Sequence, residues 1–440
     1  MEPFTDDIYI KTIDYIEFWV GNAKSFIKCF LQPLNYHPVA IRRTEKRVQF
    51  LLVNSPQLAY FKIIDGAHLE STCFIVTAAT SELDTEFHNM RQAHNGDFIK
   101  SIAFNCTDVD LCFDRAVAGG AKPVQQPCSP FQSIRTATIT SPFFDVDHVF
   151  IRRTLQLTQH QIHNPLMLFP DFVELSRTMP NTFSKTQMPS APTTLSLDHV
   201  ATCVKNGQLM ECIKWYNQCL GFKLMEIIKD GDVPRDNDDQ KLIESENYFN
   251  VSVGEDIGLR MAVISNQPAS MVTFTLPSIM WVISEAAVGG KGQVEQFVKF
   301  NGGSGIQHLA FLTNDIFKAV DYARHNLMEF IEAPDYYYNN LSKREELKKV
   351  LSHMDMTVID DLKTHKVLLD SENSSAPDAK ESYILQIFTK PICDTPTFFF
   401  EVISRENALG FGKGNIKALF EAVEMSQHRE LNEIREVPRE

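Results

Sequence analysis

The sequence predicts an α+β protein made of two copies of a βαβββ-containing half, each with a curved mixed or antiparallel sheet. Three observations lead to this prediction: a weak internal repeat of a strand and a helix, a second repeated strand–helix pair, and β-rich runs after each helix. Strand–helix–strand units followed by hairpin strands are typical of α+β domains. The 440 residues are enough for two large domains.

The first repeated element is a strand rich in β-branched and aromatic residues. Residues 13–20 (IDYIEFWV) and 197–204 (LDHVATCV) share this composition, and each leads into a segment of helical character. Within those segments, residues 27–34 (IKCFLQPL) match residues 213–220 (IKWYNQCL) at four positions without a gap. A strand and a helix are therefore expected to open each half.

The second repeated element is a short strand that runs into a helix. Residues 101–104 (SIAF) correspond to residues 308–311 (HLAF). Helices are expected at 110–118 and 316–326. Each half therefore contains a second strand–helix unit.

The halves meet at a segment rich in Pro, Thr and Ser. We predict an N-terminal half at 1–178, a linker at 179–195 and a C-terminal half at 196–440. The C-terminal half is longer because it contains two polar segments, 229–247 and 336–379. We interpret both as loops or surface helices added to the basic unit.

Residues 414–435 predict an amphipathic helix at the C-terminus. Its apolar side chains follow the 3.6-residue period, and three glycines between 410 and 414 precede it. Such a helix could close over a site as a lid. The alternative is a helix that only caps one edge of the sheet.

Composition and charge exclude several classes of protein. Hydrophobic residues make up 44% and charged residues 22%, as in globular proteins. The 56 acidic and 42 basic residues give a net charge of −14, which disfavours nucleic acids and anionic membranes as partners. No run of 18 apolar residues occurs, so no membrane-spanning helix is expected.

The N-terminus and the cysteines suggest a compartment. Three acidic residues precede the first lysine, which argues against a signal peptide or a basic transit peptide. The nine cysteines are scattered and form no Cys-x-x-Cys pair. That pattern is expected of reduced thiols in an intracellular protein, without a zinc knuckle.

Two histidines of the C-terminal half stand where the N-terminal half has other residues. His199 and His308 occupy the strand positions of Tyr15 and Ser101. The other histidines show no matched partner and are expected to be surface or structural; they include His68, His88, His148, His160 and His163.

Glu401 is a carboxylate inside the otherwise apolar strand 397–403, and its N-terminal counterpart around Phe150 contains no acid. A buried carboxylate needs a partner or a metal to offset desolvation. Together with His199 and His308 it forms a possible facial triad of the kind that binds Fe(II) in non-haem oxygenases. Zinc hydrolysis with the same ligands, or histidines that are only part of the core, are the alternatives.

The C-terminal half contains five motifs, at residues 197–200 (LDHV), 305–310 (GIQHLA), 385–391 (LQIFTKP), 399–403 (FFEVI) and 410–415 (GFGKGN). Together they resemble the 4-hydroxyphenylpyruvate dioxygenase family. The similarity covers most of the chain, including residues 18–24 (FWVGNAK), and is dense from 290 to 425. The family has the vicinal oxygen chelate fold of paired βαβββ modules, in agreement with the duplication.

The resemblance implies an iron site and a substrate pocket. His199, His308 and Glu401 would bind Fe(II), on which the family chelates the 2-oxo acid of 4-hydroxyphenylpyruvate before dioxygen reacts. The pocket would have a few polar groups inside an apolar cavity. Its matching residues are Gln293, Gln307 and Gln386 as polar anchors, Phe388, Phe399 and Phe411 as the apolar wall, and Asn415 at the base of the lid helix.

Three pocket positions depart from the family pattern. The family usually has Ser at Met261, Asn at Ser284 and Phe at Ile416. Because these positions surround the substrate ring and its hydroxyl, the changes alter which polar groups can be satisfied. The same changes, with segments like 219–222 (CLGF) and 294–297 (VEQF), make the chain resemble the animal 4-hydroxyphenylpyruvate dioxygenase-like branch. That branch is linked to 4-hydroxymandelate formation for the ubiquinone headgroup, and to mitochondria.

Three functional hypotheses follow. The first is an Fe(II)-dependent dioxygenase that forms 4-hydroxymandelate from 4-hydroxyphenylpyruvate and dioxygen. The second is ordinary tyrosine catabolism with homogentisate as product, and the third is a non-catalytic keto-acid-binding protein. The N-terminal half, without the metal ligands, is predicted to be structural and, by family resemblance, to contribute to a possible homodimer. The branch favours the mitochondrion, whereas the missing presequence favours the cytoplasm.

Overall fold

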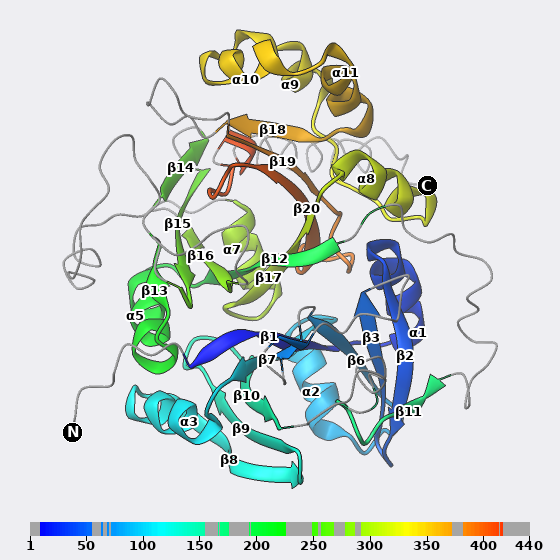
Figure 1. Ribbon diagram of the computed structural model, residues 1–440, viewed down its shortest axis with the longest axis vertical. Coiled ribbons are helices and arrows are strands. Elements are labelled where there is room, and N and C mark those ends of the chain that lie inside the picture. Colours follow the sequence, from blue (N-terminus) through cyan, green and yellow to red (C-terminus); the bar gives the residue numbers. More distant parts are fainter. Residues whose placement is uncertain are drawn as a thin grey trace, which may run out of the picture.

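The structure is a computed structural model. Two large sheets, one from each half of the chain, lie one above the other in Figure 1, with the N-terminal half below. The described residues are 9–54, 63–64, 68–69, 72–154, 166, 168–175, 193, 195–225, 249–253, 257–267, 278–286, 292–371, 382–412 and 414–416.

Among the described residues, nine strands form the N-terminal sheet: β1 (Ile10–Trp19), β2 (Tyr36–Arg43), β3 (Arg47–Asn54), β6 (Cys73–Ala79), β7 (Phe98–Cys106), β8 (Lys122–Phe131), β9 (Ile134–Thr140), β10 (Asp147–Arg153) and β11 (Val173–Glu174). They lie in the order β11-β2-β3-β6-β1-β7-β10-β9-β8. Strands β4 (Ile63–Ile64) and β5 (His68–Leu69) pair only with each other. The helices are α1 (Ala23–Phe26), continued by a π turn (Ile27–Leu31) and a 3₁₀ turn (Gln32–Leu34), α2 (Thr85–Ala93) and α3 (Val109–Ala118).

The C-terminal sheet also has nine strands: β12 (Leu195–Val204), β13 (Lys223–Leu224), β14 (Phe249–Val253), β15 (Ile257–Ser265), β16 (Met280–Ala286), β17 (Gly305–Thr313), β18 (Leu368–Ser371), β19 (Tyr383–Phe388) and β20 (Phe399–Glu406). Their order is β13-β15-β16-β12-β17-β20-β19-β18, with β14 paired to β15. The helices are α5 (Leu209–Leu220), α7 (Gln293–Phe300), α8 (Ile316–His325), α9 (Asp335–Asn339), α10 (Lys348–His353) and α11 (Met356–His365), with 3₁₀ turns at Leu341–Lys343 and Glu345–Leu347.

Both sheets follow one pairing scheme. β1 pairs antiparallel with β7 and parallel with β6, and β7 pairs parallel with β10. In the same way, β12 pairs antiparallel with β17 and parallel with β16, and β17 pairs parallel with β20. The strand that opens each βαβββ module therefore lies at the centre of its sheet. The predicted duplicated α+β architecture is confirmed.

The helix of the second strand–helix unit in each half, α3 and α8, begins at an aspartate cap. Asp108 accepts a hydrogen bond of 3.0 Å from the Leu111 N–H at the start of α3. Asp315 accepts one of 3.1 Å from the Lys318 N–H at the start of α8. An aspartate at this position satisfies a backbone donor that the helix leaves unpaired and favours the positive end of the helix dipole. Both helices begin within one residue of the predicted start.

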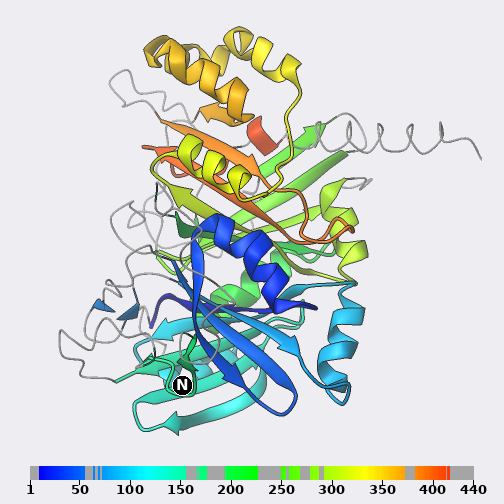
Figure 2. The same ribbon diagram turned by 90° about the vertical axis from the view of Figure 1, so that its right-hand side faces the viewer.

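A shared hydrophobic core joins the halves. α3 packs on α5, which lies directly above it in Figure 1. Arg115 of α3 donates to the carbonyl oxygens of Asn217 and Gln218, both at 3.2 Å. Phe18 of β1 meets the Phe398 ring edge-on at 5.6 Å. Figure 2 shows the blue helical segment 23–34 beneath α8, with which its last turn is in contact.

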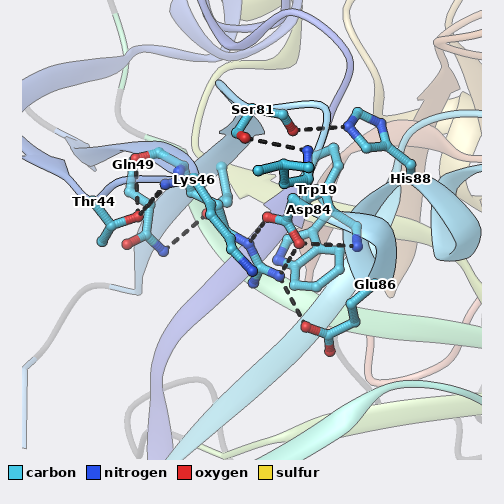
Figure 3. Close-up of polar contacts among 12 residues, drawn as sticks. Trp19, Thr44, Lys46, Gln49, Ser81, Asp84, Glu86 and His88 are labelled. Atoms are coloured by element: carbon cyan, nitrogen blue, oxygen red, sulfur yellow. Dashed lines mark hydrogen bonds and ion pairs between the residues drawn. The ribbon is translucent and has the colours of Figure 1, made fainter.

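A polar cluster at one end of the N-terminal sheet positions α2. Arg47 on β3 binds Asp84 at 2.8 Å and Glu86 at 2.9 Å, and its guanidinium lies 4.3 Å over the Trp19 ring. Asp84 also accepts from the Phe87 N–H at the start of α2. Figure 3 shows Asp84, Glu86 and Trp19 close together, with the polar contacts of the cluster drawn as dashed lines. Each of these polar groups is paired within the protein, so the cluster serves the fold.

Several predicted segments can be compared with the structure only in part. The polar segment 336–379 contains α10, α11 and part of α9, which Figure 1 shows together above the C-terminal sheet. It also contains β18, where the sequence analysis expected only loops or helices. Residues 372–379, the whole segment 229–247 and linker residues 179–192 and 194 lie outside the described residues.

Of the predicted lid helix, residues 414–416 are described and helical, and 417–435 lie outside the described residues. Leu195, assigned to the linker, is the first residue of β12. All nine cysteines are described and carry free thiols. Among the described residues, no helix combines the length and hydropathy that crossing a membrane requires.

Candidate metal centre and substrate cavity

Three adjacent strands bring the candidate metal ligands together. His199 of β12 and Glu401 of β20 are both paired with Ala310 of the central strand β17. His308 precedes Ala310 by two residues, so that both side chains leave β17 on the same face. The alternation of side chains along three paired strands therefore places the two imidazoles and the carboxylate side by side.

The ligand atoms converge on one point. Glu401 Oε2 lies 3.6 Å from His199 Nε2 and 3.3 Å from His308 Nε2. One ligand atom from each residue lies within 4.8 Å of the other two. Both measured separations are below twice a typical metal–ligand bond of about 2.1 Å. A single ion can therefore contact the carboxylate and both imidazoles.

Burial and mutual charge set the protonation of these groups. Burial alone would raise the pKa of Glu401, but the hydrogen bond from His308 and the nearby His199 outweigh it and lower that pKa. Burial lowers the pKa of His308, although Glu401 partly opposes this. An ionised carboxylate beside a neutral imidazole is the state that binds a metal ion. The donor set fits Fe(II) or another divalent metal.

Two side-chain amides form consecutive hydrogen bonds that end at Glu401. Gln386 on β19 donates from Nε2 to Glu401 Oε1 at 2.8 Å and lies 3.4 Å from the Phe411 carbonyl oxygen. Its Oε1 accepts from Asn415 Nδ2 at 2.9 Å, and the Tyr337 hydroxyl lies 3.2 Å from Asn415 Oδ1. The Gln386 amide is thus used within the protein, which favours a role in orienting Glu401.

Gly412 is required by the close approach of this amide. Its φ of +66° lies in the left-handed region, and a Cβ at this position would overlap the Gln386 side-chain oxygen. The glycine therefore lets the chain after β20 pass against Gln386 while the Phe411 ring stays beside His199, at a centroid distance of 5.1 Å.

One cavity opens over the three candidate ligands. It brings together all the predicted pocket residues except Asn415, which is fully buried behind Gln386. Three apolar residues that were not predicted to belong to the pocket, Leu259, Val282 and Val294, also line it. The cavity is lined by His199, Leu259, Met261, Val282, Ser284, Gln293, Val294, Gln307, His308, Gln386, Phe388, Phe399, Glu401, Phe411 and Ile416.

The polar groups of the cavity are few. Met261 on β15 and Ser284 on β16 are direct neighbours in the ladder, so two of the three departures from the family pattern form one patch of the wall. Gln293 Nε2 is buried and has no hydrogen-bond partner among the described residues. A buried amide without a partner is costly. The Gln293 amide is therefore suited to donate a hydrogen bond to an oxygen atom of a ligand.

The strand register corrects one sequence comparison. Tyr15 pairs with Ala103, and Ala103 pairs with Val149. Glu401 is related in the same way to His199 through Ala310, so its N-terminal counterpart is Val149. The assignment to Phe150 was wrong by one residue, because a weak repeat cannot fix the phase of a strand that alternates every residue.

The remaining histidines have different surroundings. His148 is fully buried, with its ring nitrogens 3.0 Å from the Val146 carbonyl oxygen and the Tyr216 hydroxyl, in agreement with a structural role. His88 lies 3.1 Å from the Ser81 carbonyl oxygen. His68 lies in β5, and residues 160 and 163 lie outside the described residues.

Two supporting residues were not predicted from the sequence. Asp198 Oδ2 lies 2.7 Å from Nδ1 of His199, and Arg405 binds Asp198 through two hydrogen bonds of 2.8 Å. Asp198 adjoins His199 in the motif at 197–200, and this was the available signal. No sequence signal pointed to Arg405, which lies 207 residues from Asp198 along the chain.

Comparison with known proteins places the chain among oxygenases. The sequence model of the Glyoxalase/Bleomycin resistance protein/Dioxygenase superfamily matches residues 196–344. An uncharacterised 4-hydroxyphenylpyruvate dioxygenase-like protein of Dictyostelium discoideum is 39% identical, over 94% of this chain and 95% of that protein. The 4-hydroxyphenylpyruvate dioxygenase of Neurospora crassa is 30% identical, over 94% of this chain and 91% of that enzyme.

Solved structures give the same result. A triple mutant of 4-hydroxymandelate synthase from Streptomyces coelicolor superposes with a TM-score of 0.68 at 26% identity, covering 95% of this chain and 99% of that one. The superfamily match and this superposition confirm the predicted vicinal oxygen chelate fold.

Proposed function

Because this chain belongs to the 4-hydroxyphenylpyruvate dioxygenase family of non-haem iron dioxygenases, we propose a specific reaction and site for it. The protein binds Fe(II) through His199, His308 and Glu401 and converts 4-hydroxyphenylpyruvate and dioxygen into 4-hydroxymandelate and carbon dioxide. The carboxyl carbon of the substrate leaves as carbon dioxide with its own two oxygen atoms. Both oxygen atoms of dioxygen enter 4-hydroxymandelate, one in the new carboxylate and one in the benzylic hydroxyl.

A single cavity carries this proposal. The candidate ligands lie at one part of its lining, and the paired Met261 and Ser284 lie at another. When bound, Fe(II) supplies the redox chemistry that activates dioxygen and oxidatively decarboxylates the 2-oxo acid. His199, His308 and Glu401 offer one ligand atom each, which leaves coordination positions for substrate and dioxygen.

The cavity wall orients the rest of the substrate. Phe388, Phe399 and Phe411 are buried and exclude water from the reacting groups. Gln293 offers its unpaired amide hydrogen to a substrate oxygen. A mostly apolar cavity with few polar groups fits an aromatic keto acid.

The Met261–Ser284 patch supports hydroxylation of the benzylic carbon. A thioether is a weak hydrogen-bond acceptor, and a serine hydroxyl reaches less far than the amide that the family usually has there. The ring hydroxyl of the substrate then loses partners that would hold the ring against the metal. With the ring turned away from the metal, the benzylic carbon lies nearer to it than the ring does and is hydroxylated instead.

Homogentisate formation is the second candidate. It is favoured by Gln293, Gln386 and Phe388, which match the family and line the same cavity. In that reaction the ring itself is hydroxylated and the side chain migrates.

Product identification separates the two candidates. The protein would be reconstituted anaerobically with Fe(II), given 4-hydroxyphenylpyruvate and then exposed to oxygen. The two products are isomers, so they must be separated by chromatography against standards before mass spectrometry. The proposal expects 4-hydroxymandelate, and homogentisate as the sole product would reject it. Loading with zinc in place of iron should give neither product.

A double variant tests the role of the patch. Met261→Ser combined with Ser284→Asn should raise the share of homogentisate. Leu259→Ser is the matched control, since Leu259 also lines the cavity on β15. It adds a hydroxyl two residues away and should leave the product ratio unchanged. An unchanged ratio in the double variant would argue against the patch as the determinant.

By resemblance to the animal branch, we further infer that the product supplies the ubiquinone headgroup in mitochondria, and that the protein forms a homodimer. Ring-labelled 4-hydroxyphenylpyruvate should then pass its label into ubiquinone in cells that express the protein, but not in cells that lack it. Light scattering of the purified chain would give the oligomeric state.

A further inference from the structure

Asp198 occupies a slip in the ladder between β12 and β17. Leu197 pairs with Phe311 and His199 with Ala310, so the pairing passes over Asp198. Neighbouring side chains of a regular strand point to opposite faces, and an irregularity of this kind re-aims one of them. The Asp198 carboxylate thereby reaches the imidazole of the next residue, at 2.7 Å from Nδ1.

Arg405 extends this contact to the cavity wall. Its Nε and Nη2 each donate to Asp198 at 2.8 Å, and both side chains are 2% exposed. Its Nη1 donates to the carbonyl oxygens of Ala408 and Gly410, and its guanidinium lies 5.1 Å over the Phe411 ring. One buried guanidinium thus joins the support of His199 to the loop that carries Phe411.

The N-terminal half repeats this arrangement without the imidazole. Asp14 lies at the corresponding slip of β1 and binds Arg153, with the side chains 0% and 1% exposed. Arg153 donates to the Leu168 carbonyl oxygen at 3.1 Å and lies 4.8 Å over the Phe169 ring. Phe169 in turn meets Tyr15, at 6.2 Å, where the other half has Phe411 against His199.

The duplication separates two roles of the pair. A buried Asp–Arg pair beneath an aromatic ring occurs in both halves, so it is part of the fold. In the C-terminal half the residue after the aspartate is His199, which the aspartate contacts, whereas in the N-terminal half it is Tyr15. An acceptor at Nδ1 fixes the imidazole as the tautomer whose Nε2 is free to bind a metal, and also fixes the plane of the ring.

The charge of the pair suits this role. Arg405 donates one hydrogen bond to each oxygen of Asp198. This two-pronged geometry is typical of a guanidinium bound to a carboxylate, so Asp198 presents a carboxylate oxygen to the imidazole. A carboxylate that accepts from an imidazole makes the opposite nitrogen a stronger ligand.

We propose that Asp198 and Arg405 are positioning residues that hold His199 ready to bind the metal, and that Arg405 sets the position of the Phe411 wall at the same time. The inference rests on the proposed metal site. It assigns to the C-terminal pair a task that the N-terminal pair, Asp14 and Arg153, does not have.

Asp198→Asn and its matched control Asp14→Asn test the proposal. For each variant, thermal unfolding would be measured without metal, and the affinity for Co(II) and the visible spectrum of the Co(II) form would be measured with it. Asp198→Asn should weaken Co(II) binding about 10–100-fold and shift the spectrum, as outer-shell partners of metal ligands do. Asp14→Asn should lower the unfolding temperature but leave Co(II) affinity within about twofold of the wild type.

Arg405→Lys is the second variant, with Arg153→Lys as its control. Lysine keeps the charge but cannot bind both carboxylate oxygens and the loop carbonyls together. Arg405→Lys should weaken Co(II) binding, and in the Fe(II) enzyme it should also raise KM through the displaced Phe411. Arg153→Lys should change neither. Asp198→Glu keeps a charged acceptor, so it should bind Co(II) more tightly than Asp198→Asn does.

Three outcomes would overturn the proposal: Co(II) affinity of Asp198→Asn equal to that of the wild type, an equal loss in Asp14→Asn, or failure of both Asp198→Asn and Arg405→Lys to fold. The last would mean that the pair acts through stability alone. Failure of the proposed function is distinguishable, because the wild-type protein itself would then bind neither Co(II) nor Fe(II).

Discussion

Gln386 offers a direct test of how the protein holds its carboxylate ligand. The change Gln386→Leu keeps the size of the side chain and removes its amide. In the structure this deletes a hydrogen bond of 2.8 Å to Glu401 and one of 2.9 Å from Asn415. The site is 2% exposed, so water cannot readily replace either contact.

The magnitude follows from the kinds of hydrogen bond lost. The bond to the charged carboxylate contributes about 1.5–3 kcal/mol and the neutral bond about 0.5–1.5 kcal/mol. The free energy of unfolding should therefore fall by roughly 2–4.5 kcal/mol. Because Glu401 also loses the partner that orients it, the affinity for Fe(II) or Co(II) should fall about 10–100-fold.

Gln49→Leu is the matched control in the N-terminal half. Gln49 is 7% exposed and donates to Glu17 at 3.2 Å and to Thr77 at 3.0 Å, so it too is a buried amide bound to a carboxylate. Its loss should reduce stability, as measured by urea unfolding, without changing metal affinity, as measured by Co(II) titration. The reasoning would be refuted if Gln386→Leu bound Co(II) as tightly as the wild type, or if both variants lost affinity equally.

Two further predictions concern Gly412 and His148. Gly412→Ala should lower stability by about 1–2 kcal/mol through its left-handed backbone alone, and should weaken metal binding because the new methyl displaces Gln386; normal Co(II) affinity would contradict this. Burial lowers the pKa of His148 from 6.5 to about 4. Below pH 6.5 the unfolded chain takes up a proton that the folded chain refuses, so the folded protein loses roughly 3 kcal/mol as the pH falls from 6.5 to 4. Urea unfolding should show this slope in the wild type but not in His148→Gln, and equal slopes would contradict it.

The duplicated fold could be predicted because strand composition and helical periodicity are local. Both βα units show these signals, and the strand alternation is strong enough to place His199, His308 and Glu401 on buried strands. Their meeting over one point depends on the pairing of β12, β17 and β20, which the repeat suggested only indirectly. The predicted counterpart of Glu401 in β10 was wrong by one residue for the same reason, because strand register is set by long-range pairing.

Other features of the site leave no trace in the sequence. The contact between Asp198 and Arg405 joins residues 207 positions apart, and the slip that re-aims Asp198 is a property of the ladder. Asn415 was expected in the pocket, but it lies behind Gln386, because the chain turns inward at Gly412. Local patterns cannot show which of two neighbouring polar groups faces a cavity.

The most direct test of the account is the metal content of the wild type and of Glu401→Gln after anaerobic loading with Fe(II) and removal of excess metal. Glutamine keeps the size of the side chain but removes the charge between the two imidazoles. We expect one iron per wild-type chain and almost none in the variant. An iron-free wild type, or a variant that retains a full equivalent, would contradict a site built from His199, His308 and Glu401.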